Sequence, residues 1–119
     1  MPETTTEDLV TGLRGWVRGD APHVQAAVEL LIWHQGWLLR ASFLAACVRG
    51  PLAPGLVASI DWDKARRFAD SSPRCSTSER GVLHLAVALG EDLYHLSGMG
   101  TAHRQAIAAA VASAMEVDR

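Results

Sequence analysis

Residues 29–40 read ELLIWHQGWLLR, and the interpretation of this stretch decides the fold. Placed on one continuous helix from residue 23 to residue 40, it has one narrow polar stripe, formed by Gln25, Glu29, Gly36 and Arg40. Roughly two-thirds of the circumference is apolar or aromatic, which is wider than the face of an ordinary amphipathic helix. We therefore predict a Trp-bearing helix at the centre of the domain, enclosed by its own chain or facing a second subunit.

On this projection, Trp33 and Trp37 share one flank with Leu30, and His34 lies near the middle of the apolar arc. The tryptophans are interpreted as core or interface, with a stacking platform as the alternative. His34 is either a buried core histidine whose ring nitrogens find partners, or a ligand or pH-sensing site. Gly36 weakens the helix and allows a kink or the close approach of another backbone.

Length and composition predict a single globular domain over residues 1–119, with residues 1–5 frayed. Apolar residues make up 49% and charged residues 20%, and the net charge of −2 gives no sign of a nucleic-acid-binding surface. The polar, acidic start MPETTTEDLV does not resemble a secretory signal, and the run LLIW is too short to span a bilayer. We expect a cytoplasmic protein in which Cys47 and Cys75 are free thiols, with a disulfide between them as the less favoured alternative.

Helical patterns explain most of the chain, and we predict an all-α, compact bundle of five or six short helices. Helix starts are assigned to the threonines before residue 7, to Asp20, to Asp61, to a capping box of Ser76 with Glu79, and to Thr101. The helix that starts at Ser76 is expected to end near Gly90. LVASI, residues 56–60, is a short extended piece that we expect to be too isolated to build a sheet.

Four segments look like a family of small, uncharacterised, all-helical proteins of actinobacteria and their phages and mobile elements. They are AAVELLIWHQGWLLRASFLAACV (26–48), IDWDKARRFA (60–69), STSERGVLHLAVALGEDLYHLSG (76–98) and QAIAAAVASAM (105–115). The resemblance implies a helical fold and a host range, and it implies no function.

Two groups of residues are candidates for catalytic chemistry. Glu91, Asp92 and His95, flanked by His84 and His103, have a spacing that can hold a metal on a rigid helix, but Gly90 interrupts that helix. Cys75 follows Arg74 just before a helix start, which can activate a thiol. The sequence contains no GxSxG, P-loop or GxGxxG motif. We predict no catalytic residue, no metal and no cofactor, and keep a metal- or thiol-dependent enzyme as the second alternative.

The first alternative is a DNA-binding regulator with a degenerate helix–turn–helix around residues 85–111. Acidic residues lie among the arginines of the same region, a mixture typical of a solvated face, so nucleic-acid binding is disfavoured. The DNA-contact candidates are Arg66, Arg67, Arg80, His103, Arg104 and Gln105.

The last helix carries Ile107, Val111 and Met115 in one stripe, with alanines around most of the remainder. Small residues let helices approach closely, so this helix is a packed terminal helix or a docking face. We expect a non-enzymatic, cytoplasmic interaction or regulatory protein that acts by helix-mediated contacts with a protein partner or with itself as a homodimer. The predicted interaction surface comprises Leu30, Trp33, His34, Trp37, Ile107, Val111 and Met115.

Overall fold

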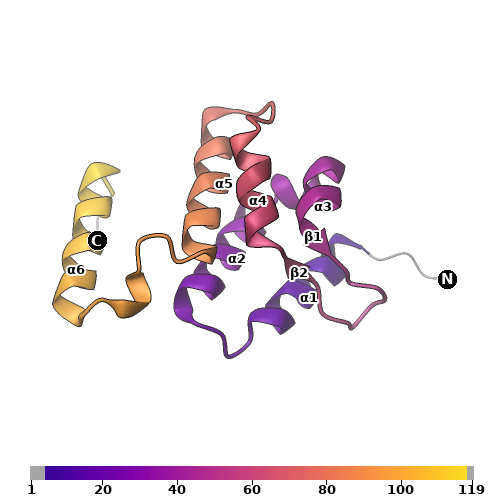
Figure 1. The fold of residues 1–119 in the computed structure, drawn as a ribbon, viewed down its shortest axis with the longest axis horizontal. Coiled ribbons are helices and arrows are strands. Elements are labelled where there is room, and N and C mark those ends of the chain that lie inside the picture. The colour runs from indigo at the N-terminus through magenta and orange to yellow at the C-terminus, as the bar shows by residue number, and fades with distance from the viewer. Residues whose placement is uncertain (1–4, 118–119) are drawn as a thin grey trace.

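The computed structural model describes residues 5–117 and shows the predicted all-α class (Figure 1). The elements follow in the order α1 (Thr6–Val17), α2 (Pro22–His34), 3₁₀ helix η1 (Trp37–Leu39), α3 (Ala41–Cys47), β1 (Val48–Arg49), β2 (Ser59–Ile60), α4 (Trp62–Asp70), α5 (Thr77–Gly90), 3₁₀ helix η2 (Leu96–Gly98) and α6 (Thr101–Ala114). Helix α2 is central, because it packs against α1, α5 and both 3₁₀ helices.

Side-chain caps begin three of the helices. The Ser76 hydroxyl accepts from the Glu79 N–H at 3.1 Å, while the Glu79 carboxylate accepts from the Ser76 N–H at 2.9 Å. Thr5 and Asp8 form the same reciprocal pair at the start of α1. Asp61 caps α4 through the Lys64 N–H. The predicted capping box and the Asp61 cap are therefore confirmed.

Two predicted caps are wrong. Ala21 stands at the N-cap of α2, and the carboxylate of Asp20 instead accepts from the Ala21 N–H, one residue before the helix. Gly100 stands at the N-cap of α6, and Thr101 is already its first helical residue. In both cases the predicted capping residue is one position away from the place where the helical dihedral angles begin.

The continuous helix from residue 23 to residue 40 is also wrong. Helix α2 ends at His34, and Gln35 adopts a left-handed conformation with φ of 65° while its N–H donates to the Leu31 carbonyl at 2.9 Å. This closes the helix with a C-terminal cap, and the chain restarts in η1 after Gly36. The break separates the two tryptophans: Trp37 is fully buried, whereas 80% of Trp33 is exposed.

The core forms around an aromatic cluster of Trp37, Phe43 and Phe68, whose ring centroids lie 5.6–6.0 Å apart. The indole Nε1 of Trp37 donates to the carbonyl oxygen of Glu79 at 2.8 Å, so the polar atom of this buried ring is satisfied. The Arg40 guanidinium lies 4.4 Å from the centroid of the same ring. Residue 37 therefore belongs to the core and not to an interaction surface.

The prediction that residues 56–60 are too isolated to build a sheet is wrong. The last two residues of this segment form β2, which pairs antiparallel with β1 in the register Val48↔Ile60 and Arg49↔Ser59. The ladder closes the loop between α3 and α4, and buries Ile60 against the core. So short a pairing is held by packing against the helices and not by its own hydrogen bonds.

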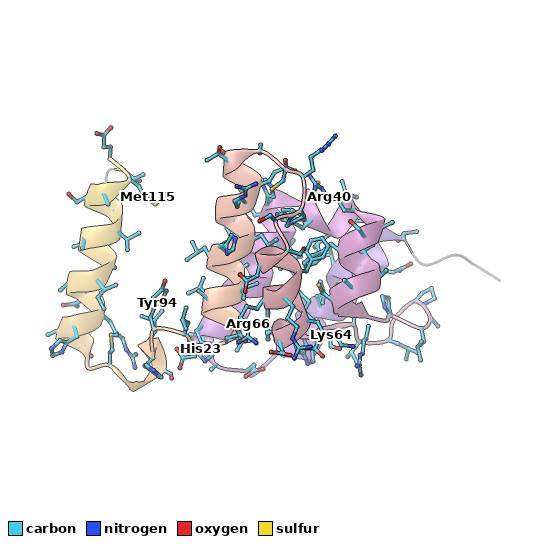
Figure 2. All side chains as sticks on the ribbon, turned by 45° about the horizontal axis from the view of Figure 1, so that its top comes forward. His23, Arg40, Lys64, Arg66, Tyr94 and Met115 are labelled. Atoms are coloured by element: carbon cyan, nitrogen blue, oxygen red, sulfur yellow. The ribbon has the colours of Figure 1, made fainter. Side chains whose placement is uncertain are left out.

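Helices α2 and α5 pack along each other in opposite directions, because the start of α2 lies at the end of α5 and the segment after α2 lies at the start of α5. Beyond α5, residues 91–100 lead away from the body to α6, which stands apart in both views (Figures 1 and 2). The molecule is therefore elongated, with extents of 51 × 33 × 26 Å.

Candidate interaction surface

Helix α6 is almost entirely exposed to solvent. Among the described residues, every side chain of α6 is exposed except Ala109 and Ala112, which are half-buried. The stripe predicted from the sequence is solvent-exposed: 38% of Ile107, 51% of Val111 and 67% of Met115 are accessible. Figure 2 shows Met115 at the far end of this helix, well clear of the body. We call Ile107, Val111 and Met115 the α6 stripe.

A second exposed apolar surface lies on the α2–α5 pair. On α2, exposed or half-buried apolar residues recur at the spacing of one helical face, ending in the highly exposed Trp33. On α5, Leu85 is 47% exposed and lies one turn before the half-buried Leu89. We call this surface the α2/α5 face; its residues are Pro22, Ala26, Leu30, Trp33, Leu85 and Leu89.

The α2/α5 face opens into a cavity of about 330 Å³ at the end where α2 begins and α5 ends. This cavity lies where the first turn of α6 approaches the start of α2, and Figure 2 places His23 and Tyr94 at that end of the molecule. A groove therefore begins beside the α6 junction and is continuous with the α2/α5 face. The lining residues are Pro22, His23, Ala26, Leu89, Leu96, Ser97 and Arg104.

Polar contacts fix the segment between α5 and α6. His23 donates from Nδ1 to the Leu89 carbonyl at 2.7 Å, at the negative end of α5. Asp92 accepts from the Leu96 N–H at 2.9 Å and from the Ser97 hydroxyl at 2.5 Å. The hydrogen bond from Ser97 is the main reason that the pKa of Asp92 lies below its usual value.

The predicted surface is thus corrected in two places. Trp37 is a core residue, and His34 is half-buried at the end of α2. The Nε2 atom of His34 is buried and has no hydrogen-bond partner among the described residues, so the structure does not pair this ring nitrogen as the core interpretation requires. Leu30 and Trp33 do lie on the α2/α5 face. Ala26 and Leu85 were missed, although the apolar arc of α2 already contained Ala26.

The metal candidates are not brought together: within residues 5–117, no group of three histidine, cysteine or carboxylate side chains has metal-binding geometry. Glu91 instead pairs with Arg66 at 3.3 Å, and Asp92 fastens the segment before α6. Cys47 is buried, and burial is the main cause that raises the pKa of its thiol to about 11. Within the described residues, the metal candidates therefore lie apart, and Cys75, the thiol candidate, is half-buried before α5.

The DNA-contact candidates lie on three different helices, α4, α5 and α6. Arg66 pairs with Asp63 and with Glu91, and Arg67 pairs with Asp63 at 2.9 Å, so both guanidinium groups have carboxylate partners. Arg80 lies exposed near the start of α5. The remaining three, His103, Arg104 and Gln105, lie on α6, away from the arginines of α4.

In comparisons with known proteins, no family model, no curated protein and no solved structure matches the chain. Among the described residues, none of the helices has the length and apolar character needed to cross a bilayer.

Proposed function

We propose that this chain is a non-enzymatic interaction protein that binds another protein chain through the α2/α5 face and the α6 stripe. The observation that carries the proposal is the exposure of α6 together with Trp33. An isolated helix shorter than about 12–15 residues is marginal in water. Helix α6 has 14 residues and no buried side chain, so packing against its own chain contributes little to its stability.

Exposed apolar surface supports the same conclusion. Single exposed apolar residues are ordinary, but contiguous patches of several hundred square ångströms mark interaction sites. Trp33 alone exposes about 200 Å², because tryptophan has up to about 250 Å² of surface and 80% of it is accessible here. Buried tryptophan side chains are also frequent sources of binding energy at protein interfaces.

The wider setting is part of the proposal. It includes a cytoplasmic location, which the two free cysteines support. It also includes an origin in an actinobacterium or one of its phages or mobile elements, which the resemblance in residues 26–115 supports. Partner binding in that setting would regulate or scaffold a host or viral protein.

Site-specific photo-crosslinking tests the proposal. A photoreactive benzophenone amino acid replaces Trp33 or Val111, and a third variant carries it at Leu52, which is 91% exposed in the loop between β1 and β2. We expect irradiation of cells that naturally express the protein to give discrete protein adducts from positions 33 and 111, with none from position 52. Adducts of equal yield from all three positions, or none at 33 and 111, would refute the proposal.

A further inference from the structure

We propose that two copies of this chain exchange their α6 helices, so that each α6 lies along the α2/α5 face of the other copy. This inference rests on the proposed function and names the partner of the same surface. Four features of the molecule favour a second copy over a different protein or over closure of α6 on its own body.

The first feature is that one chain leaves two apolar surfaces of matching length uncovered. Helix α6 has 14 residues and is about 21 Å long, and α2, which forms most of the groove, has 13 residues and is about 20 Å long. An exchange related by a two-fold axis covers both surfaces in both copies and leaves no free end. A different partner would need two separate contacts, one along the groove and one along α6.

The second feature is the composition of α6. Between Ala106 and Met115 the only polar residue is Ser113, so most of the helix has no solvent-facing polar side. A helix that is apolar around its circumference is normally enclosed by protein. In the exchanged dimer, the α6 stripe faces the partner's body, and the alanine side of each α6 faces the other α6. Alanine allows two helices to approach to about 8 Å.

The third feature is the fixed segment between α5 and α6. Asp92 holds the Leu96 N–H and the Ser97 hydroxyl, and Arg104 in the first turn of α6 donates to the Ser97 carbonyl at 3.0 Å. These bonds define the direction in which α6 leaves the body, so that its first turn reaches the end of the α2/α5 face and the rest of the helix stands apart from it. The groove is therefore open to a helix from another chain.

The fourth feature is the area and charge of the proposed interface. The large exposed apolar side chains of the α2/α5 face, of the α6 stripe and of the adjoining segment between α5 and η2 number seven. They offer roughly 600 Å² per copy, or about 1,200 Å² for the pair, which reaches the range of specific interfaces. These seven side chains are uncharged, so their burial between two copies takes no charge out of water. The seven are Trp33, Leu85, Leu93, Tyr94, Ile107, Val111 and Met115.

Disulfide trapping distinguishes the possible occupants. In a background in which Cys75→Ser removes the half-buried thiol, one chain carries Leu85→Cys and a second, tagged chain carries Val111→Cys. Both positions are exposed, so the variants are expected to fold. We expect mild oxidation of the mixture to give a disulfide between the two chains, and Leu52→Cys in place of Leu85→Cys to give at least tenfold less.

A single chain carrying both Leu85→Cys and Val111→Cys completes the test. Exchange gives a covalent dimer on a non-reducing gel, and light scattering of the wild type gives twice the mass of one chain. A disulfide closed within one chain, or a monomer at all concentrations, overturns the exchange. If the monomer still forms photo-adducts with another protein from position 33, the proposed function stands and only the exchange is wrong. If it forms none, the exchange and the proposed function are both wrong.

Discussion

Trp37 donates a hydrogen bond of 2.8 Å from its indole Nε1 to the backbone carbonyl oxygen of Glu79, and this bond joins the segment after α2 to the first turn of α5. Glu79 also serves the capping box of α5 and accepts from the Arg40 guanidinium at 2.7 Å. Arg40 in turn lies over the Trp37 ring. The two tryptophans of the WHQGW motif therefore differ in environment, because Trp37 is buried in the core and Trp33 is exposed.

The two tryptophans are expected to respond oppositely to truncation. Trp37→Ala removes a fully buried ring and its hydrogen bond, and should lower the free energy of unfolding by about 3–5 kcal/mol. Trp33→Ala removes an exposed ring and should change it by less than about 0.5 kcal/mol at protein concentrations too low for association. Urea unfolding followed by circular dichroism measures both. Similar losses in the two variants would contradict the division.

Two glycines of α5 form a matched pair. A Cβ at Gly90 would clash with the indole of Trp62, whereas a Cβ at Gly81 would meet no atom within 4 Å. Gly90→Ala should therefore destabilise the protein by about 1–3 kcal/mol through overpacking. Gly81→Ala should stabilise it by about 0.5–1 kcal/mol, because alanine is a better helix former. Thermal unfolding of both variants should show shifts of opposite sign, and a shared sign would show that the α4–α5 contact is wrong.

The Glu79 carboxylate should give a pH dependence to stability. Its hydrogen bond from the Ser76 N–H is the main cause that lowers the Glu79 pKa, and Arg40 adds to this effect. Because the pKa is lower in the folded state, the contribution is fully present above the ordinary value of about 4.3 and is lost as the pH falls through the folded-state value.

Glu79→Gln provides the control for this pH dependence. The difference in unfolding free energy between the wild type and this variant should be constant near pH 7 and should shrink between the ordinary pKa and more acidic pH. Chemical denaturation at a series of pH values follows the difference. A gap that widened with acidification would show that the carboxylate does not act as a charged cap.

The two cysteines should differ in reactivity. At pH 8, a thiol pKa of about 11 leaves roughly one Cys47 side chain in a thousand as thiolate, and the side chain is also buried. A soluble aromatic disulfide reagent should therefore modify one thiol per folded chain quickly, at the half-buried Cys75. Cys75→Ser should abolish this fast phase. Fast modification of Cys47 in the folded protein would contradict its place in the core.

Local signals in the sequence predicted much of the fold. The capping box of Ser76 with Glu79 and the Asp61 cap depend only on neighbouring residues, so their side chains identify the helix starts directly. The end of α2 had a weaker signal. Gln35 adopts the left-handed conformation that glycine usually supplies, and the adjacent Gly36 was interpreted as a kink within a longer helix.

The candidate site was harder to predict, because it depends on which surfaces remain uncovered after packing. The projection correctly indicated a wide apolar face on α2, but the break at Gln35 rotates Trp37 into the core and leaves Trp33 outside. Leu85 was missed because an apolar residue on α5 is equally consistent with burial. The α6 stripe was identified, and its exposure follows from the direction that Asp92 and Ser97 give to the preceding segment.

Amide hydrogen exchange of α6 tests the central claim, that α6 is covered by another chain, most directly. We predict that the amides of residues 105–115 become more protected as protein concentration rises, while those of the buried part of α2 stay constant. Trp33→Asp, which places a charge on the α2/α5 face, should abolish the change. Exchange in α6 at the rate of an unstructured peptide at every concentration, in the wild type and the variant alike, would contradict the account.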